Sequence, residues 1–591
     1  MTDTSVASQQ AVDTRRSRRA GELGLLSALC LALTVAGPWL FDTYLLNILI
    51  KALFFAAAAV TVDLLWGYTG YLTFGQSAFF GVGAYAAGLV FTHLGFSPAL
   101  AFLAVGAALA AAALLAAVTG WLSFYRGASP FFATVISLVL PVVLTQSILS
   151  GGSFTGSSSG LTGYETFDLS LEAWYVIAAG FLSLVSLLAW VVTRSDGGRL
   201  LVALRDNESR CAYLGLNTAR LRILLLVVCG MIASLAGFGY GAFSGVVAPE
   251  LAGFVFGTEL IIWVALGGRA TVWGPVLGAI LINVAAAYLS GSMPFVWQLF
   301  LGLAFILVIL LLPRGLLPLL LAPLRRRAAA SPLPQLVPRP AAPARADDGP
   351  ALVMQGVAKH FGSLKVLEGI DLQARGGELV GLIGPNGAGK TTMMRCISDG
   401  AERSAGTVSL GGHEIGRRGP DHGVRLGLGR KFQNANVFES LTVAESLRIA
   451  GTLRAAPSWL RRSAELSLPE HALAVLRTTA LDAKLGAVTR DLSHGEQQAL
   501  ELAMVLALEP RLLLLDEITE GLQPSVIDRL ARALCWERRE RGTAMLIVEQ
   551  NVAFARQVCD RYVVLKQGSV ADAGAMQDED SSQRIFDHLR V

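Results

Sequence analysis

Long apolar runs fill the first half of the chain. No Asp, Glu, Lys or Arg lies between Asp63 and Arg126, and none lies between Arg269 and Arg314. A stretch of about 20 apolar residues is enough to cross a bilayer as a helix. We therefore expect an all-α membrane domain of about 8–10 spans, some of them broken or re-entrant. The candidate spans are residues 23–41, 43–66, 70–92, 98–124, 129–150, 173–193, 223–247, 255–268, 273–291 and 294–312.

Two polar segments interrupt this apolar half. Residues 151–172 are rich in Gly, Ser and Thr and predict an external loop, whereas residues 194–222 carry six arginines and predict a cytoplasmic loop. Arginines also gather at residues 15–19 and 325–327, on either side of the apolar block. Both ends of the membrane domain should therefore face the cytoplasm. The first apolar run has no small-residue cleavage site, so we interpret it as a retained anchor.

The second half has the pattern of a soluble α/β domain. After Ala351, short apolar strands alternate with amphipathic helices. Nine of the 22 prolines lie from Pro313 to Pro350, which predicts an extended, semi-stiff linker that is not packed. The expected parts are a disordered basic N-terminus (1–20), a transmembrane domain (21–313), a Pro-rich linker (314–350) and the α/β domain (351–591).

Composition agrees with this division. Hydrophobic residues make up 53% of the chain and charged residues only 16%, against about 25% in soluble proteins. The six cysteines show no CxxC pair and no metal-ligand spacing, so we interpret them as unpaired thiols in a reducing compartment. The net charge of +4 says little by itself, and we expect no nucleic-acid partner.

A phosphate-binding motif opens the chemistry of the α/β domain. Residues 384–392 read Gly-Pro-Asn-Gly-Ala-Gly-Lys-Thr-Thr and follow the apolar strand 379–383. Glycines in this context let backbone N–H groups surround nucleotide phosphates at a helix N-terminus. Lys390 should neutralise phosphate charge, and Thr391 should coordinate Mg²⁺. The expected ATP contacts are Gly384, Asn386, Gly387, Gly389, Lys390, Thr391 and Thr392.

Two acids end a second apolar strand at 512–515. Asp516 suits the outer shell of Mg²⁺, and Glu517 suits polarising an attacking water. An apolar strand that ends in acids is common, so this motif gains meaning only beside the others.

The run Leu-Ser-His-Gly-Glu-Gln at 492–497 completes the set. It comes after the phosphate loop, and its serine stands 23 residues before Asp516. It resembles the signature motif of the ABC transporter ATPases, and that resemblance covers about residues 351–591. It implies that Ser493 and Gly495 bind the γ-phosphate held by an opposing ATPase subunit.

The same resemblance implies further roles. Phe361 would stack on adenine, although a phenylalanine of the core or surface is the commoner reading. Gln433 would sense Mg²⁺ and couple the ATPase to the membrane domain. The implied magnesium ligands are Thr391, Gln433 and Asp516, and the implied catalytic residues are Glu517, Gln433 and Gln550.

The α/β domain departs from that family at three places. Ile518 replaces the usual proline after the catalytic acid, and the loop beyond it reads Glu-Gly-Leu-Gln-Pro at 520–524 without the usual aspartate. Gln550 replaces the usual switch histidine. A glutamine can hydrogen-bond a γ-phosphate but cannot carry a proton. We hypothesise that hydrolysis here is slower than usual or depends on Glu517 alone.

Residues 66–81 of the apolar half read Trp-Gly-Tyr-Thr-Gly-Tyr-Leu-Thr-Phe-Gly-Gln-Ser-Ala-Phe-Phe-Gly. This run resembles the permeases of bacterial branched-chain amino acid and urea importers, and the resemblance covers nearly all of residues 40–318. So many glycines favour a broken helix, which either binds substrate or allows close helix packing. Asp63 should face the protein interior, where it binds a polar substrate or serves as a hydrogen-bonded structural acid.

Other segments of the permease half support the resemblance. Residues 198–215 look like the cytoplasmic loop by which such permeases seat on their ATPase. Residues 259–274 fit the family, and Trp263 to Arg269, with Asp63 and Trp66, look more like the urea type.

The α/β domain has mixed features of this kind. Residues 429–433 and 493–495 also resemble the urea type, whereas residues 519–524 and Gln550 resemble the second ATPase of these importers.

The resemblance implies an importer of branched-chain or hydrophobic amino acids, or of urea and short amides, in the bacterial inner membrane. It implies a second permease subunit, a second ABC ATPase subunit, a periplasmic substrate-binding protein, a small-molecule substrate and surrounding membrane lipid. An exporter or flippase half-transporter is one alternative, although the internal loops are short for that class. A membrane-anchored regulatory ATPase is another.

Overall fold

The computed structural model describes residues 26–125, 130–292, 314–322, 333–340, 349–519, 524–578 and 580–589, together with scattered residues between 299 and 312. The chain forms two compact units. The first unit comprises Met1–Leu201, Ala219–Pro332 and Trp459–Arg462, and the second comprises Val202–Thr218, Leu333–Ser458 and Ser463–Val591. The N-terminus at 1–20 and the span expected at 294–312 fall wholly or mostly outside the described residues.

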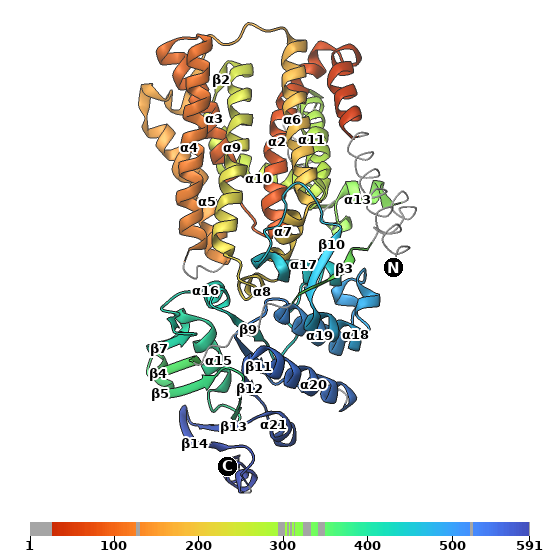
Figure 1. Ribbon diagram of the computed structural model, residues 1–591. Helices are drawn as coiled ribbons and strands as arrows, with labels where there is room; N and C mark the ends of the chain where they lie inside the picture. The colour runs from red at the N-terminus through yellow and green to blue at the C-terminus, as the bar shows by residue number, and fades with distance from the viewer. Residues whose placement is uncertain are drawn as a thin grey trace. The chain divides into compact units, whose positions relative to one another are not determined.

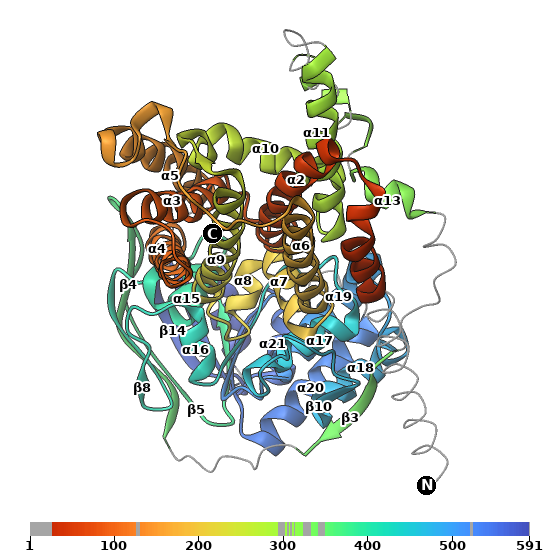
Figure 2. The ribbon, with the colours of Figure 1, turned by 90° about the horizontal axis from the view of Figure 1, so that it is seen from above.

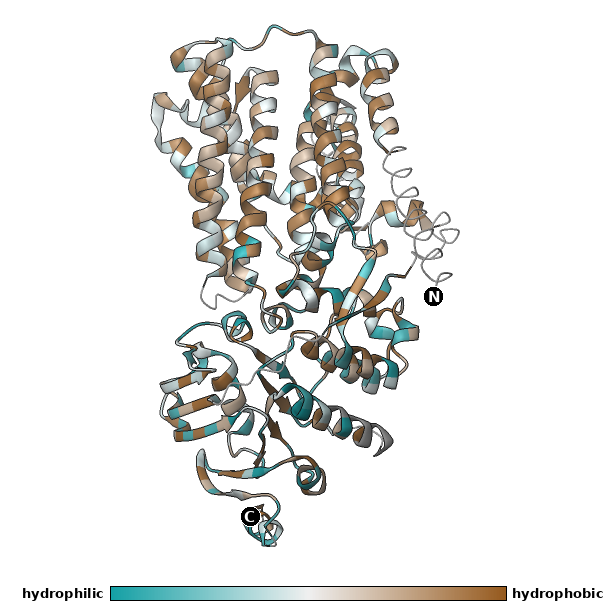
Figure 3. Ribbon diagram, viewed as in Figure 1, coloured by the Kyte–Doolittle hydropathy of each residue, from teal (hydrophilic) through white to brown (hydrophobic). Residues whose placement is uncertain are grey.

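The first unit is helical. Among the described residues, seven helices are long and apolar enough to cross a membrane. They are α2 (Thr43–Asp63, continued by the π-helix Leu64–Tyr68), α3 (Gln76–Leu94), α4 (Pro98–Phe124), α5 (Pro130–Ser150), α6 (Leu171–Thr193), α9 (Thr218–Ser244) and α11 (Trp273–Ser292). Figure 3 colours them mostly with hydrophobic residues, and Figure 2 looks along several of their axes.

Two further apolar helices are too short to be counted as spans. They are residues Leu26–Leu40 and α10 (Phe254–Gly267). The expectation of a helical membrane domain is confirmed. The structure gives seven long helices and two short ones in its described part, where the sequence predicted about eight to ten spans.

Small residues let the helices of this unit approach closely. A Cβ built on Gly83 of α3 would lie 1.7 Å from the carbonyl oxygen of Ser234 in α9. A Cβ on Gly237 would lie 1.9 Å from the carbonyl oxygen of Phe80. Only glycine fits at either position, which is the packing device of membrane helices. Some of the glycines in this half therefore serve packing.

The second unit is built on a six-stranded sheet with the order β14-β13-β6-β12-β11-β9 (Figure 1). Its strands are β6 (Leu379–Ile383), β9 (Leu428–Lys431), β11 (Leu512–Asp516), β12 (Ala544–Val548), β13 (Arg561–Lys566) and β14 (Ser569–Ala575). All neighbours are parallel except β13 and β14. The carboxyl ends of parallel strands therefore meet at one edge, which is where α/β proteins bind ligands.

A second sheet and several helices complete this unit. The sheet has the order β5-β4-β7-β8, from β4 (Pro350–Phe361), β5 (Leu364–Arg375), β7 (Ala405–Leu410) and β8 (His413–Glu414). The helices are α15 (Lys390–Ser398), α16 (Pro420–Arg425), α17 (Val443–Ala450), α18 (Glu470–Thr478), α19 (His494–Leu506), α20 (Pro524–Arg541), α21 (Val552–Val558) and α22 (Ser581–Leu589). The predicted α/β architecture is confirmed.

Part of the Pro-rich linker is packed, contrary to expectation. Residues Gln335–Arg339 form strand β3, which pairs in parallel with β10 (Glu465–Pro469). Leu336 and Val337 give this stretch two adjacent apolar side chains, and a proline is tolerated in a strand at the edge of a sheet. The linker is therefore anchored on the ATPase unit at this point.

The arginine-rich loop is helical and divides between the units. Helix α7 (Asp196–Asp206) begins it, α8 (Glu208–Ala212) follows, and residues 202–218 belong to the second unit. In the first unit, the Asp196 amide donates to the carbonyl oxygen of Arg461, at 3.1 Å.

Candidate active site

The phosphate loop has the shape that its sequence predicts. It runs from the end of β6 to the start of α15, and Gly387 and Gly389 have positive φ angles of 82° and 100°. A Cβ on Gly384 would lie 2.3 Å from the carbonyl oxygen of Leu565, so this position also needs glycine. The loop is therefore a preformed backbone cradle that opens at a helix N-terminus.

Lys390 lies inside this cradle. Its Nζ donates to the carbonyl oxygens of Gly384, at 2.7 Å, and Pro385, at 3.0 Å. Burial lowers the pKa of this lysine, and the nearby charges of Glu517 and Asp516 oppose that shift. The ammonium group thus holds the loop closed around the place where phosphates bind in such a motif.

The two acids follow β11 at the same edge of the sheet. Asp516 is 2% exposed, and burial raises the pKa of its carboxyl, with the Glu517 charge adding to the shift. Its Oδ1 has no hydrogen-bond partner in the described part of the chain. A buried oxygen without a partner is the kind of group that a magnesium ion satisfies. Thr391, at the start of α15, has an exposed side chain and offers a hydroxyl.

The three residues predicted to be catalytic lie together, because Gln433 and Gln550 both contact Glu517. Gln433 Nε2 donates to its Oε2 at 2.8 Å, and Gln550 Nε2 donates to its Oε1 at 2.7 Å. Gln550 Nε2 also lies 3.5 Å from Asn386 Oδ1 in the phosphate loop. Each oxygen of the Glu517 carboxylate therefore has a glutamine donor, and one of these glutamines contacts the phosphate loop.

The backbone at Glu517 is held in a strained conformation. Its φ is +47°, which is uncommon for a residue other than glycine. Its amide donates to the carbonyl oxygen of Val548, at 2.8 Å. Beside it, Glu549 is 3% exposed and accepts from the Thr519 amide at 3.1 Å and from its hydroxyl at 2.9 Å. Glu549 was not among the predicted site residues, although an acid directly after an apolar strand is a usable signal.

The signature serine serves its own helix in this chain. Ser493 is the N-cap of α19: its Oγ accepts from the Glu496 amide at 3.4 Å and donates to Glu496 Oε2 at 3.0 Å. Gly495 lies in the first turn of the same helix. The cap therefore fixes the first turn of α19. Fixed N–H groups at a helix N-terminus are suitable donors to an anion.

The remaining predicted contacts lie at two places. Thr392 follows Thr391 in the first turn of α15. Phe361 ends β4 and is 55% exposed, and Lys359 Nζ lies 4.6 Å from the centroid of its ring. This phenylalanine is therefore a surface residue with an accessible ring face, and not part of the core. Of the loop beyond the acids, residues 520–523 lie outside the described residues.

A buried ion pair ties residues 202–218 to the ATPase fold. Arg210 is 0% exposed, and its Nη1 lies 3.3 Å from Glu501 Oε1 on α19. The same guanidinium donates to the carbonyl oxygens of Glu501 and Arg430, each at 3.2 Å. Burial raises the pKa of Glu501, and the Arg210 charge opposes that shift.

Tyr213 extends this contact to two more elements. Arg430 on β9 donates to the Tyr213 hydroxyl at 3.2 Å and to Ser398 Oγ, at the end of α15, at 2.6 Å. The Tyr213 hydroxyl lies 3.2 Å from the same Ser398 oxygen. The Arg430 guanidinium also lies 4.6 Å from the ring centroid of Phe432, next to Gln433. One segment thus contacts the helix of the phosphate loop, the strand before Gln433 and the signature helix.

In the membrane unit, the glycine-rich segment breaks the helix as predicted. The π-helix Leu64–Tyr68 ends α2, and α3 starts only at Gln76. Single π turns inside helices are frequent at functional sites. Gln76 is 0% exposed; its Oε1 accepts from the Thr61 hydroxyl at 3.2 Å, and its Nε2 has no partner in the described part of the chain.

Asp63 acts on the backbone of a distant turn. Its carboxylate accepts from the amides of Ala270 at 2.6 Å, Thr271 at 3.2 Å and Val272 at 3.1 Å. Ala270 and Val272 have positive φ angles of 59° and 62°, so these hydrogen bonds hold an unfavourable conformation. This geometry favours the structural reading of Asp63 over direct substrate binding.

Each half of the chain matches the model of a known protein family. The model described as "Branched-chain amino acid transport system / permease component" matches residues 44–312, and the model described as "ABC transporter" matches residues 367–520. The arginine transport ATP-binding protein ArgV of Corynebacterium glutamicum is 34% identical over 250 residues, which cover 40% of this chain and 95% of that protein. The chain belongs to the ABC transporter family.

Other relatives cover the ABC transporter ATPase half in the same way. The high-affinity branched-chain amino acid transport ATP-binding protein BraF of Pseudomonas aeruginosa is 31% identical over 250 residues, covering 41% of this chain and 98% of that protein. Among solved structures, an "ATP binding subunit of ABC transporter" is 25% identical and covers 41% of this chain and 95% of that chain, with a TM-score of 0.35. This ABC transporter chain therefore fuses a multi-pass permease domain to an ATP-hydrolysing transport ATPase.

Proposed function

We propose that this chain is one half of an ATP-driven importer in the bacterial inner membrane, with its ATPase domain in the cytoplasm. The observation that carries this proposal is the place of residues 202–218. They come from the permease half of the sequence, yet Arg210 and Tyr213 are buried against the helix of the phosphate loop, the strand before Gln433 and the signature helix. A membrane-anchored regulatory ATPase has no need of such a segment. The short internal loops argue against an exporter or flippase.

In the ATPase, Glu517 is the proposed general base. The glutamines on its two oxygens keep the carboxylate oriented to take a proton from the attacking water. Asp516, Thr391 and Gln433 are the residues that would hold a magnesium ion, and such an ion would neutralise phosphate charge. Gln550 can orient Glu517 or a phosphate but cannot accept the proton in its place.

A second ATPase subunit is needed for this chemistry. Ser493 caps α19 and fixes the first turn of this helix. This supports a role for Ser493 and the first-turn N–H groups as donors to a nucleotide on an opposing subunit. Phe361 presents an exposed ring to adenine on its own side. We propose a complex with a second permease, a second ABC ATPase and a periplasmic substrate-binding protein.

The substrate class is a small molecule with both polar and apolar groups. Gln76 directly follows the helix break, and its side chain is buried. Its Nε2 has no hydrogen-bond partner in the described part of the chain. One turn further along α3, Phe80 belongs to a cluster of rings with Phe55, Tyr240 and Phe256. A polar amide beside aromatic rings suits a branched-chain or hydrophobic amino acid, or a short amide or urea. The names of the relatives favour amino acids.

Uptake into reconstituted vesicles tests this proposal. The full complex, with its cognate binding protein, should accumulate at least one of leucine, acetamide and urea when ATP is supplied inside. Accumulation of leucine alone would select the amino-acid branch, and accumulation of urea or acetamide alone would select the amide branch. Transport of none of the three would refute the substrate assignment.

The role of Gln550 has its own test. If hydrolysis is limited by the missing histidine, Gln550→His should raise ATP turnover in the assembled transporter. Gln550→Asn, which keeps the amide but shortens the side chain, is the control and should lower turnover. Unchanged turnover in Gln550→His would refute the idea that this position limits the reaction.

A further inference from the structure

The segment that carries Gln433 begins where strand β9 ends. This strand pairs with β11 only as far as Lys431. Beyond that point, the Phe432 amide donates to Glu501 Oε1 at 3.1 Å, and the Phe432 carbonyl oxygen accepts from Lys431 Nζ at 3.1 Å. The Gln433 carbonyl oxygen accepts from Gln498 Nε2 at 2.9 Å. Side chains therefore supply the partners that a neighbouring strand would otherwise give to this backbone.

The amide of Gln498 can adopt only one orientation here. Its Oε1 accepts from Lys431 Nζ, and because an ammonium group can only donate, the amide oxygen must face the lysine. The amide nitrogen then faces the Gln433 carbonyl oxygen, which can only accept. Lys431 is 2% exposed and Gln498 is 5% exposed, so water has little access to either contact. This position needs one side chain that both accepts and donates, as glutamine does.

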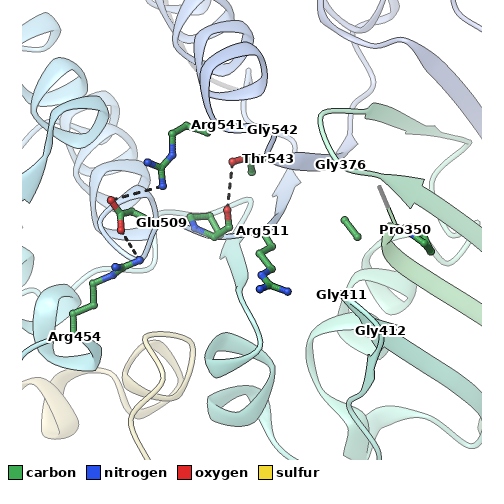
Figure 4. A pocket seen from close by; sticks show the side chains of 13 residues that line it. Pro350, Gly376, Gly411, Gly412, Arg454, Glu509, Arg511, Arg541, Gly542 and Thr543 are labelled. Carbon is green, nitrogen blue, oxygen red and sulfur yellow. Dashed lines mark hydrogen bonds and ion pairs between the residues drawn. The ribbon is translucent and has the colours of Figure 1, made fainter. Parts of the chain in front are cut away.

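Helix α19, which carries Gln498, is fixed at both ends. Ser493 caps its first turn. Just beyond its last turn, Glu509 forms ion pairs with Arg454 at 2.5 Å and with Arg541 at 3.8 Å. Figure 4 shows both guanidinium groups directed at this one carboxylate. Gln498 therefore projects from a helix whose position in the ATPase unit is well defined.

Gln433 joins this helix to the catalytic acid. Its carbonyl oxygen is bound by Gln498, and its side-chain Nε2 donates to Glu517 Oε2 at 2.8 Å. A shift of the Gln433 backbone would therefore move the donor on its side chain away from the carboxylate. Groups that take part in a reaction must be held to within about 0.5 Å of the productive geometry.

We propose that Lys431 and Gln498 are positioning residues for ATP hydrolysis. Lys431 fixes the amide of Gln498, and Gln498 fixes the backbone of Gln433, so that the Gln433 side chain stays on Glu517. In the described part of the chain, the hydrogen bonds of this pair do not reach the phosphate loop at 384–392. The inference rests on the proposed role of Glu517 as general base.

Steady-state ATP hydrolysis by the assembled transporter in vesicles tests this inference. Gln498→Glu keeps an acceptor for Lys431 but replaces the donor to the Gln433 carbonyl oxygen with a second acceptor. We expect kcat to fall by about tenfold or more, because a displacement of about 1 Å can reduce a rate by that much. The KM for ATP should change by less than about twofold, because the lost contact does not bind the nucleotide.

A second variant removes both members of the pair. In Lys431→Met with Gln498→Met, neither the ammonium nor the amide is left buried without its partner, and kcat should fall in the same way. Thr452→Val is the matched control, since the Thr452 hydroxyl is also buried in the ATPase unit and donates to the carbonyl oxygen of Ile449 at 2.7 Å. Its kcat should be unchanged. An unchanged kcat in both Gln498 variants, or an equal fall in Thr452→Val, would overturn the proposal.

Glu517→Gln separates a failure of this inference from a failure of the proposed general base. Normal turnover in Glu517→Gln would show that Glu517 is not the base, so that the pair has no catalytic group to position. If Glu517→Gln is inactive while both Gln498 variants keep the kcat of the unmodified transporter, the base is supported and the positioning role is wrong.

Discussion

Asp63 and Glu501 are both buried carboxylates, but their oxygens have different kinds of partner. Asp63, in the membrane unit, is satisfied by three backbone amides of a turn that lies more than 200 residues further along the chain. Glu501, in the ATPase unit, is paired with the Arg210 guanidinium and also accepts from the Phe432 amide at 3.1 Å. The first carboxylate holds the backbone of its own domain. The second holds a segment from the other half of the sequence.

The two carboxylates therefore hold different partners: Asp63 a turn of the permease unit, and Glu501 an arginine from residues 202–218. Satisfying an acid with backbone amides avoids placing a second charge in an apolar region, where each charge is costly. Pairing two buried charges stabilises little in net terms, but losing one partner is expensive. The Arg210–Glu501 pair is therefore suited to making one segment indispensable to the ATPase fold.

The largest expected effect is that of Asp63→Ala. It leaves three amides of a strained turn without their acceptor, at a cost of about 1–3 kcal/mol each. We expect loss of the folded permease, measured as a collapse of thermal stability in detergent. Asp63→Asn, which keeps one oxygen acceptor, should be affected less. A stable and transport-competent Asp63→Ala variant would contradict the structural role.

Next comes Arg210→Ala. It leaves Glu501 buried without its charge partner, which costs about 3–5 kcal/mol. Chemical denaturation of the ATPase unit within the full chain should show this loss. Glu501→Gln in the same background should restore part of the stability, because the uncompensated charge is gone. Without such rescue, the ion pair is not the source of the effect.

The pH dependence of that loss follows from the raised pKa of Glu501. An acid whose pKa is raised by folding destabilises the folded state as pH rises from its unfolded value toward its folded value. Removing Arg210 takes away a charge that lowers this pKa, so the penalty should grow. We expect Arg210→Ala to cost less stability near pH 5 than near pH 8. A cost independent of pH over that range would contradict ionisation of Glu501.

The smallest effect is that of Tyr213→Phe. It removes one hydroxyl from the contacts with Ser398 and Arg430, at about 0.5–1.5 kcal/mol, and keeps the ring. Folding should be nearly unchanged, but the link to the phosphate-loop helix is weakened. We expect uptake to fall more than ATP hydrolysis when both are measured in the same vesicles. Equal falls would assign Tyr213 to stability alone.

Local motifs could be predicted from the sequence because each depends on residue type and order within one short segment. The phosphate loop at 384–392, the acids at Asp516 and Glu517, and the helix break after Tyr68 all follow from residue type and order. The span was expected at 70–92, but its helix begins only at Gln76, and residues 70–75 are not helical.

Distant pairings could not be read in that way. Nothing near Asp63 points to Ala270, and nothing near Gln433 or Gln550 shows that both donate to one carboxylate. The linker strand at Gln335–Arg339 was missed because its prolines indicate an unpacked chain, whereas its pairing depends on β10, more than 120 residues later.

Under the proposed function, residues 202–218 transmit ATP hydrolysis to the permease. The most direct test measures ATP hydrolysed and substrate accumulated in the same vesicles, for the unmodified complex and for the double variant Arg210→Met with Glu501→Gln, which removes both charges and leaves no buried charge unpaired. The expected result is that the double variant still hydrolyses ATP while uptake falls at least several-fold, so that more ATP is used per molecule moved. An unchanged ratio of ATP hydrolysed to substrate accumulated would contradict it.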